Sequence, residues 1–373
     1  MDTSDADTVF RACTRFLTGH YRQRPRQVLE ALAAATDPDL EVDRYGTGDL
    51  IARFEAEVAG LLGKEAAVFM PSGTMCQQIA LRLHADRRGV HNVAMHPRNH
   101  LDRHEHHAYA RLHGLHGLPV GDPDRLLTLD DLGAVAEPLG ALLLELPQRE
   151  IGGQLPAWDE LEAITGWARE RGIPLHLDGA RLWESGPFYG REYSQIAAPF
   201  DTVYVSFYKG LGGIAGAALA GPGDLIAEAR VWQRRHGGNL VSLYPYVLAA
   251  RQGLADRLSR MAAYHARARE IAAALASFPQ IAIVPDPPHT NMMHLYLRGD
   301  RDRLLSAALD TARQTGVWLF DRLGASPLPG YHKFELTVGD ATLDLSVEEL
   351  AGLFEALLHK AEAAEGALQP AAS

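Results

Sequence analysis

The sequence has few cysteines, no long apolar run and a deficit of positive charge, and each absence excludes a class of protein. Its 373 residues include only two cysteines, Cys13 and Cys76, so a disulfide framework does not hold the chain together. No apolar stretch is long enough to span a bilayer, and the acidic N-terminus lacks the basic-then-apolar layout of a signal peptide. The formal net charge of −11 argues against a nucleic-acid partner or an anionic membrane surface. We therefore expect a protein of the cytoplasm.

The first two thirds of the sequence alternate between strand-like and helix-like segments. Apolar residues make up 47% of the chain and charged residues 22%, enough for one large core and a smaller second one. Apolar spacing predicts helices over residues 47–62 and 158–171. Buried strands are expected at residues 66–70, 141–145, 173–178, 201–207 and 215–220. This alternation predicts a doubly wound α/β domain.

The pattern changes after about residue 246. A long helix is expected from Leu254 to Leu275, followed by strands at residues 281–284, 291–297 and 333–338. These segments predict a smaller C-terminal α+β domain. The expected organisation is an N-terminal segment (1–46), a large domain (47–250), a small domain (251–360) and a flexible tail (361–373).

Lys209 is the most informative residue. It follows an apolar strand and precedes glycines, which places it at a strand's carboxyl end, where open α/β sheets bind ligands. Asp178 ends an earlier strand, 31 positions upstream (209 − 178), which leaves room for a crossover. A lysine that bonds to an aldehyde and an acid that keeps a pyridine nitrogen protonated are what pyridoxal phosphate chemistry needs. The alternative is a solvated lysine in a turn.

Several residues suit a phosphate or a carboxylate. Ser72, Gly73 and Thr74 lie between a predicted strand and a predicted helix, whose first N–H groups and dipole attract anions. An ordinary helix cap is the alternative. Arg181 follows Asp178, and Arg234 lies in a basic segment; both could instead form surface ion pairs or complement a helix end.

A dense run of histidines begins at His91 and reaches His107. A metal site is one interpretation, although the spacing fits no zinc pattern well. Alternatively, one histidine ring lies over a flat aromatic cofactor, or the histidines are surface residues. No metal site is predicted.

The glycines after Lys209 also satisfy a loose G-x-G-x-x-A pattern, which would indicate a nicotinamide-dependent dehydrogenase. However, residues 215–220 resemble a strand rather than the helix that this motif requires, and no acid stands at the expected distance. A binding protein that has kept a cofactor fold without catalysis is a third possibility.

Taken together, the motifs resemble the low-specificity threonine aldolases, members of the β-eliminating lyase group of fold-type I pyridoxal phosphate enzymes. The resemblance covers nearly the whole chain, and the two motifs around Asp178 and Lys209 are specific together. The matching segments are Leu62-Gly63-Lys64-Glu65, Ser72-Gly73-Thr74-Met75, His100 with Glu105, His176-Leu177-Asp178-Gly179-Ala180-Arg181, Ser206-Phe207-Tyr208-Lys209-Gly210-Leu211-Gly212 and Thr290-Asn291-Met292.

The resemblance implies a large domain with a mostly parallel sheet covered by helices on both faces, and a homo-oligomer, tetramer or dimer, with shared active sites. It implies that Lys209 bonds covalently to pyridoxal 5′-phosphate, that Asp178 pairs with the ring nitrogen and that His100 stacks on the ring. His100 is also the candidate base. Further implied cofactor ligands are Ser72, Gly73, Thr74, Arg181 and Arg234. Implied substrate ligands are Arg181, Tyr45, Arg149 and Lys333.

Three departures from the family pattern concern the substrate. The segment Leu146–Glu150 lacks a histidine that the family often has near the substrate hydroxyl, and Ala12–Thr14 replaces a serine motif. Glu335 falls near the position of a carboxylate-binding arginine, for which Lys333 or Arg149 could substitute. We expect Cα–Cβ cleavage of a threonine-like amino acid to glycine and an aldehyde. The alternative is β-elimination or another lyase reaction on a different amino acid.

Overall fold

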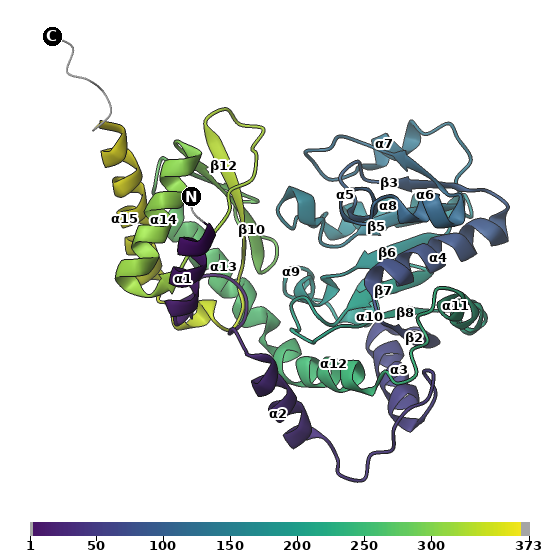
Figure 1. Cartoon of the computed structure of the whole chain (residues 1–373). Helices are drawn as coiled ribbons and strands as arrows, with labels where there is room; N and C mark the ends of the chain where they lie inside the picture. Colours follow the sequence, from purple (N-terminus) through teal and green to yellow (C-terminus); the bar gives the residue numbers. More distant parts are fainter. Residues whose placement is uncertain (1–2, 367–373) are drawn as a thin grey trace. The chain divides into compact units, whose positions relative to one another are not determined.

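The structure is a computed structural model that describes residues 3–366 (Figure 1). The described residues divide into two compact units: residues 23–261 form one, and residues 3–22 with 262–366 form the other. Residues 3–22 therefore group with the C-terminal residues, whereas the sequence suggested a separate segment over 1–46. The reason is strand pairing, because β1 (Arg15–Phe16) lies parallel to β11 (Val317–Trp318).

The unit of residues 23–261 contains a seven-stranded sheet in the order β2-β8-β7-β6-β5-β3-β4. Strand β8 is antiparallel to both of its neighbours, and the pairs from β7 to β4 are parallel. The strands are β2 (Ala66–Met70), β3 (Asn92–Met95), β4 (His116–Pro119), β5 (Ala141–Glu145), β6 (Leu175–Gly179), β7 (Thr202–Ser206) and β8 (Ala217–Gly221). This sheet confirms the predicted mostly parallel α/β architecture.

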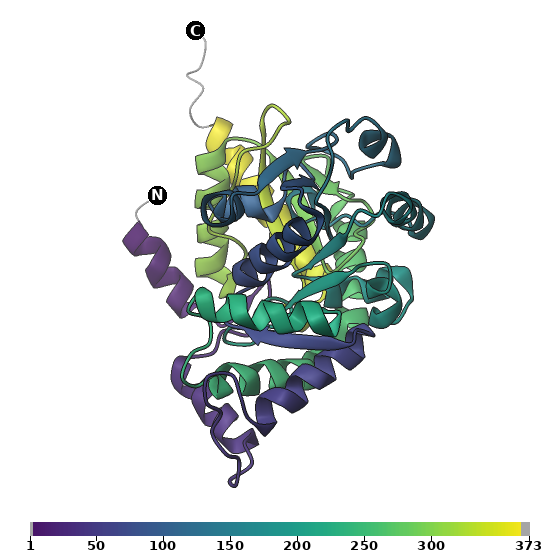
Figure 2. The same cartoon turned by 90° about the vertical axis from the view of Figure 1, so that its right-hand side faces the viewer.

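Helices pack on both faces of this sheet (Figures 1 and 2). The helices of this unit are α2 (Pro25–Ala35), α3 (Asp49–Leu62), α4 (Gly73–Arg88), α5 (His100–His104), α6 (Ala108–His113), α7 (Leu129–Gly133), α8 (Trp158–Glu170), α9 (Gly186–Tyr189), α10 (Tyr193–Ala197), α11 (Gly223–Arg235), α12 (Tyr244–Arg257) and the 3₁₀ turns η1 (Arg149–Ile151), η2 (Leu182–Glu184) and η3 (Leu258–Arg260).

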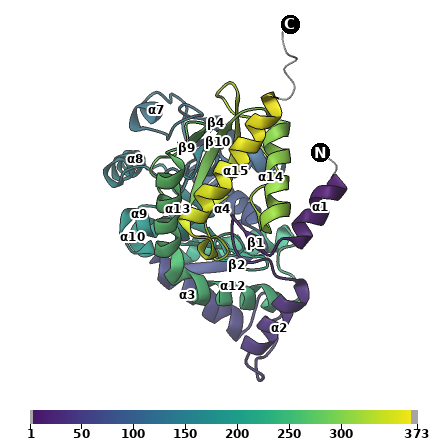
Figure 3. The same ribbon diagram turned by 90° about the vertical axis from the view of Figure 1, so that its left-hand side faces the viewer.

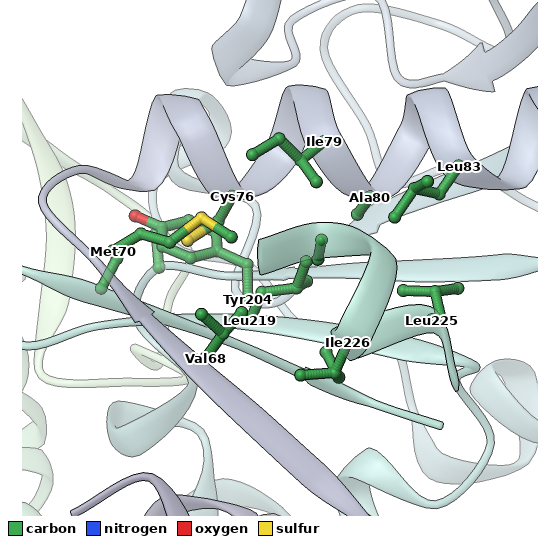
Figure 4. Close-up of a cluster of buried hydrophobic side chains, with 13 residues drawn as sticks. Val68, Met70, Cys76, Ile79, Ala80, Leu83, Tyr204, Leu219, Leu225 and Ile226 are labelled. Carbon is green, nitrogen blue, oxygen red and sulfur yellow. The ribbon is translucent and has the colours of Figure 1, made fainter. Parts of the chain in front are cut away.

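Burial on both faces explains why β2 is apolar at every position. Successive side chains of a strand point to opposite faces. Val68 and Met70 therefore join the buried cluster under α4 and α11, which Figure 4 shows in close-up. Phe69 points the other way, where its ring centroid lies 5.8 Å from that of Phe54 on α3. A strand covered on both sides has no need for polar alternation.

The second unit contains a three-stranded antiparallel sheet in the order β12-β10-β9. Its elements are α1 (Thr3–Ala12), α13 (Met261–Leu275), β9 (Ile281–Val284), β10 (Met292–Arg298), α14 (Arg301–Thr315), β12 (Tyr331–Thr337), the 3₁₀ turn η4 (Thr342–Asp344) and α15 (Val347–Gly366), together with β1 and β11. Figure 3 shows α15 alongside α14, with α1 against α14.

Two expectations need correction here. The single long helix expected from Leu254 to Leu275 is divided into α12 and α13 by the turn η3. Residues 361–366, expected as the start of a flexible tail, belong to α15, which continues to Gly366; the other residues of the expected tail, 367–373, lie outside the described part of the chain. No helix among residues 3–366 combines the length and the apolar composition that a membrane crossing requires.

Candidate active site

Asp178 and Lys209 come from neighbouring strands, as the sequence predicts. Asp178 lies near the end of β6, and Lys209 follows the end of the adjacent parallel strand β7. Asp178 is 1% exposed. Burial raises the pKa of this carboxyl, while the charges of His100 and Lys209 oppose that rise. Three of the predicted catalytic groups thus lie close enough to interact.

The Lys209 ammonium is surrounded by charges of both signs. Burial lowers its pKa, and the nearby charge of Arg181 lowers it further. Asp178 has the opposite effect, while Arg149 contributes in the same direction as Arg181. A lysine with a lowered pKa more readily supplies the neutral amine that attacks an aldehyde.

His100 opens the short helix α5, and its ring is held by an acid. Its Nδ1 lies 2.9 Å from Oε1 of Glu105, which is buried. This contact fixes the ring and leaves Nε2 as the nitrogen that can exchange a proton with another group. The rest of the histidine run is divided among other partners: His104 contacts Glu150, and His107 contacts Asp102. Among residues 3–366 there is no group of three His, Cys, Asp or Glu side chains placed to hold a metal ion.

The N-terminus of α4 offers backbone N–H groups that could hold an anion. Ser72 caps the helix by accepting a hydrogen bond from the Met75 N–H at 3.4 Å. The N–H groups of Gly73 and Thr74, in the first turn, have no intrahelical acceptor. A Cβ at Gly73 would lie 1.9 Å from the Tyr204 hydroxyl oxygen, so only glycine lets the helix start this close to β7.

Two carboxylates beside this site, one half-buried and one buried, escaped the sequence analysis. Glu145 is the register partner of Asp178 on β5, and burial together with the Asp178 charge raises its pKa to about 8. Glu184 lies on η2, where burial raises its pKa to about 7 despite the opposing charges of Arg181 and Lys209. Glu145 stands at the end of a predicted strand, as Asp178 does, and this position was the available signal.

The other predicted ligands, Tyr45, Arg234 and Lys333, stay predictions. Tyr45 is 57% exposed, and its N–H donates to the Val241 carbonyl. Arg234 is exposed in the last turn of α11. Neither residue forms a hydrogen bond to Asp178 or Lys209 within the described part of the chain. Lys333 lies on β12 in the other compact unit.

The residues present fit pyridoxal phosphate. The buried Asp178 carboxylate can face a ring nitrogen, and Lys209 can reach an aldehyde from the neighbouring strand. At Gly73 the start of α4 packs against Tyr204 with no room for a Cβ, and the bare N–H groups of this first turn can hold a phosphate.

Comparison with known proteins agrees with this geometry. The family model for β-eliminating lyases matches residues 21–299. The low-specificity L-threonine aldolase of Escherichia coli K12 is 30% identical over 343 residues, which cover 87% of this chain and 92% of that protein. An aldolase of Penicillium aethiopicum is 35% identical over 285 residues, 73% of this chain and 70% of that protein.

Solved structures give the same result. A candidate L-allo-threonine aldolase from Listeria monocytogenes has a TM-score of 0.92 at 43% identity, covering 96% of this chain and 99% of its own. A threonine aldolase from Leishmania major, at 19% identity and a TM-score of 0.72, shares the fold, with 93% and 99% covered.

The chain belongs to the β-eliminating lyase family, and its fold is that of the fold-type I pyridoxal phosphate enzymes. It is a lyase that uses pyridoxal 5′-phosphate, which confirms the family, cofactor and enzyme class expected from the sequence.

Proposed function

We propose that this protein is an aldolase that cleaves the Cα–Cβ bond of a threonine-like β-hydroxy-α-amino acid to give glycine and an aldehyde. The observation that carries the proposal is the convergence of Lys209, Asp178 and two arginines, Arg181 and Arg149, at the carboxyl ends of β5, β6 and β7. The threonine aldolases among the relatives support the same reaction.

Each residue has a distinct task in this proposal. Lys209 would hold the cofactor through its ε-amine. Asp178 would hold the proton on the ring nitrogen, and Gly73 and Thr74, with Ser72, would bind the phosphate. When bound, the cofactor withdraws the electron pair that bond cleavage leaves on Cα.

The arginines decide which bond breaks. The bond that is aligned with the cofactor's π system is the one that is weakened, so a clamp on the substrate carboxylate selects the reaction by orientation. We assign this clamp to Arg181 and Arg149, which both lie near Lys209. In this segment we assign Arg149 because it carries the positive charge that acts on Lys209; its Nη1 also donates to Glu150 Oε1 at 2.8 Å.

The proton of the substrate hydroxyl needs an acceptor. His100, oriented through Nδ1 by Glu105, presents Nε2 for this purpose, and it also stacks on the ring in our proposal.

Tyr45, Arg234 and Lys333 are proposed as further ligands. We also propose that the protein forms a homo-oligomer, dimer or tetramer, which the exposed Tyr45 and Val241 side chains support. The two free cysteines support a location in the cytoplasm.

Labelling of Lys209 tests the cofactor chemistry. The purified protein should absorb visible light, and borohydride should fix the cofactor on Lys209, as read by peptide mass spectrometry. Lys209→Ala should lose the label. Lys64→Ala is the matched control, because burial also lowers the pKa of Lys64 but its ammonium donates to the Phe200 carbonyl away from the site. A label retained in Lys209→Ala would contradict the assignment.

The products identify the reaction. Threonine and allo-threonine should yield glycine and acetaldehyde in equal amounts, quantified by chromatography. Keto acid and ammonia without glycine would contradict the aldolase and support β-elimination.

A further inference from the structure

Behind the Asp178 carboxylate lies an unbroken chain of buried polar side chains. We propose that this chain is a relay that keeps Asp178 ionised and thereby keeps the proton on the cofactor's ring nitrogen. Its members are Gln77, His176, Thr202 and His84. The inference rests on the proposed function, because it assumes that Asp178 faces that nitrogen.

The fold aligns the members by simple periodicities. His176 and Asp178 are two positions apart on β6, so they point to the same face of the sheet. Thr202 is the register partner of His176 on β7. Gln77 and His84 are seven positions apart on α4, about two turns, so they lie on one side of that helix. All five side chains are at most 4% exposed.

Every hydrogen bond in this chain is donated toward Asp178. The Gln77 amide nitrogen donates to Asp178 Oδ2. Gln77 Oε1 can only accept, so His176 Nε2, 2.8 Å away, must be its donor. The other ring nitrogen of a neutral His176 then accepts from the Thr202 hydroxyl, also at 2.8 Å. With its own proton used, the Thr202 oxygen accepts from His84 Nε2 at 2.8 Å.

Both histidines are neutral at physiological pH, which this direction requires. Burial lowers the pKa of His176 to about 3, and the nearby His84 adds to the effect. Burial likewise lowers the pKa of His84 to about 4. A neutral imidazole has one donor and one acceptor nitrogen, so each ring transmits the direction of the chain.

The relay addresses a specific electrostatic problem. Burial alone raises the pKa of Asp178 and so favours a neutral carboxyl, which could not stabilise a protonated ring nitrogen. Aligned donors polarise one another and stabilise a negative charge at the end of the chain. A purely structural network would only satisfy buried polar atoms, and it would leave the protonation of the ring nitrogen unaffected.

The test reads that protonation directly. Each variant is loaded with pyridoxal phosphate carrying ¹⁵N in the ring, and the NMR signal of this nitrogen is followed against pH. In Gln77→Leu the deprotonation midpoint should fall by about one to two pH units, the equivalent of one lost charge-assisted hydrogen bond. In Thr202→Val the midpoint should fall by roughly half a pH unit, because the lost hydrogen bond lies two hydrogen bonds further from Asp178.

Two further variants distinguish the loss of the relay from a general effect of losing a buried hydroxyl. Thr202→Ser restores the hydroxyl and should restore the wild-type midpoint. Thr165→Val removes another buried hydroxyl, which donates to the Leu161 carbonyl on α8, and should leave the midpoint unchanged. Thr202→Val is nearly isosteric, so the test does not depend on Gln77→Leu folding.

The outcomes are distinct. Wild-type midpoints in loaded, folded Gln77→Leu and Thr202→Val proteins would overturn the relay while leaving the proposed function intact. An unprotonated ring nitrogen in the wild-type protein would overturn the pairing with Asp178, and the relay with it. A fall in Thr165→Val equal to that in Thr202→Val would also overturn the relay.

Discussion

Replacing Gly73 by alanine tests whether the start of α4 is as tightly confined as the structure shows. The added Cβ would lie 1.9, 2.3 and 2.7 Å from Oη, Cζ and Cε2 of Tyr204. Ordinary contact begins at 3.4 Å, so either the ring or the helix must move by about 1.5 Å (3.4 − 1.9). Tyr204 is 3% exposed within the cluster of Figure 4, which leaves the ring little room.

Two opposing effects set the magnitude. Alanine in place of glycine stabilises a helix by about 0.5–1 kcal/mol. Overpacking of a well-filled core costs roughly 1–3 kcal/mol, so we expect net destabilisation. Because the same movement displaces the N–H groups proposed to hold the phosphate, the dissociation constant for pyridoxal phosphate should rise at least about tenfold.

Urea unfolding and cofactor titration measure the two effects. Gly60→Ala is the matched control: Gly60 lies inside α3, and an added Cβ would meet nothing within 4 Å beyond its chain neighbours and its own helix backbone, so this variant should be as stable as the wild type or more so. Tyr204→Leu removes all three clashing atoms. Gly73→Ala should therefore lower the free energy of unfolding by less in the Tyr204→Leu protein than in the wild type. Wild-type stability and cofactor affinity in Gly73→Ala would refute the reasoning.

Three further predictions follow from other parts of the same unit. Asp43→Ala should lower the free energy of unfolding by about 2 kcal/mol, because the buried carboxylate accepts hydrogen bonds from Leu243 N and Tyr244 N at the start of α12; a loss below about 0.5 kcal/mol in urea unfolding would contradict this. Burial raises the pKa of Glu184 from 4.5 to about 7, so its stabilising contribution is complete below pH 4.5 and is lost as the pH rises through 7. Glu184→Gln should therefore gain stability relative to the wild type between pH 5 and pH 9, by up to roughly 3 kcal/mol, and equal pH profiles would count against it. Arg149→Ala should raise KM for threonine by about tenfold or more, with partial recovery in Arg149→Lys; an unchanged KM would remove Arg149 from the proposed carboxylate clamp.

Strong local patterns made much of the large unit predictable. Strands β2, β5, β7 and β8 are rich in apolar or β-branched residues, β6 follows the apolar Ile173-Pro174-Leu175, and α3 and α8 have clear apolar faces, so their positions could be predicted from the residues alone. Strands β3 and β4 could not, because their short segments, Asn92–Met95 and His116–Pro119, contain polar residues, glycine and proline and become strands only through pairing with neighbours.

The site was predictable to a similar degree. Asp178 stands near the end of a predicted strand, and Lys209 follows the end of another. Glu145 holds the same kind of position at the end of β5, so its place was a usable signal. Gln77 had no such signal, because its importance depends on a contact with Asp178 that nothing in its local sequence encodes.

By itself, the sequence determined the family and the cofactor, and it predicted Asp178 and Lys209 as the two residues at the centre of the proposed chemistry, because these depend on residue type and on spacing along one strand or turn. The tertiary structure decided which carboxyls are buried together, how closely α4 approaches β7 and which hydrogen bonds support Asp178. Those properties arise between segments far apart in the chain, where burial and the surrounding charges, rather than local pattern, set the protonation of each group.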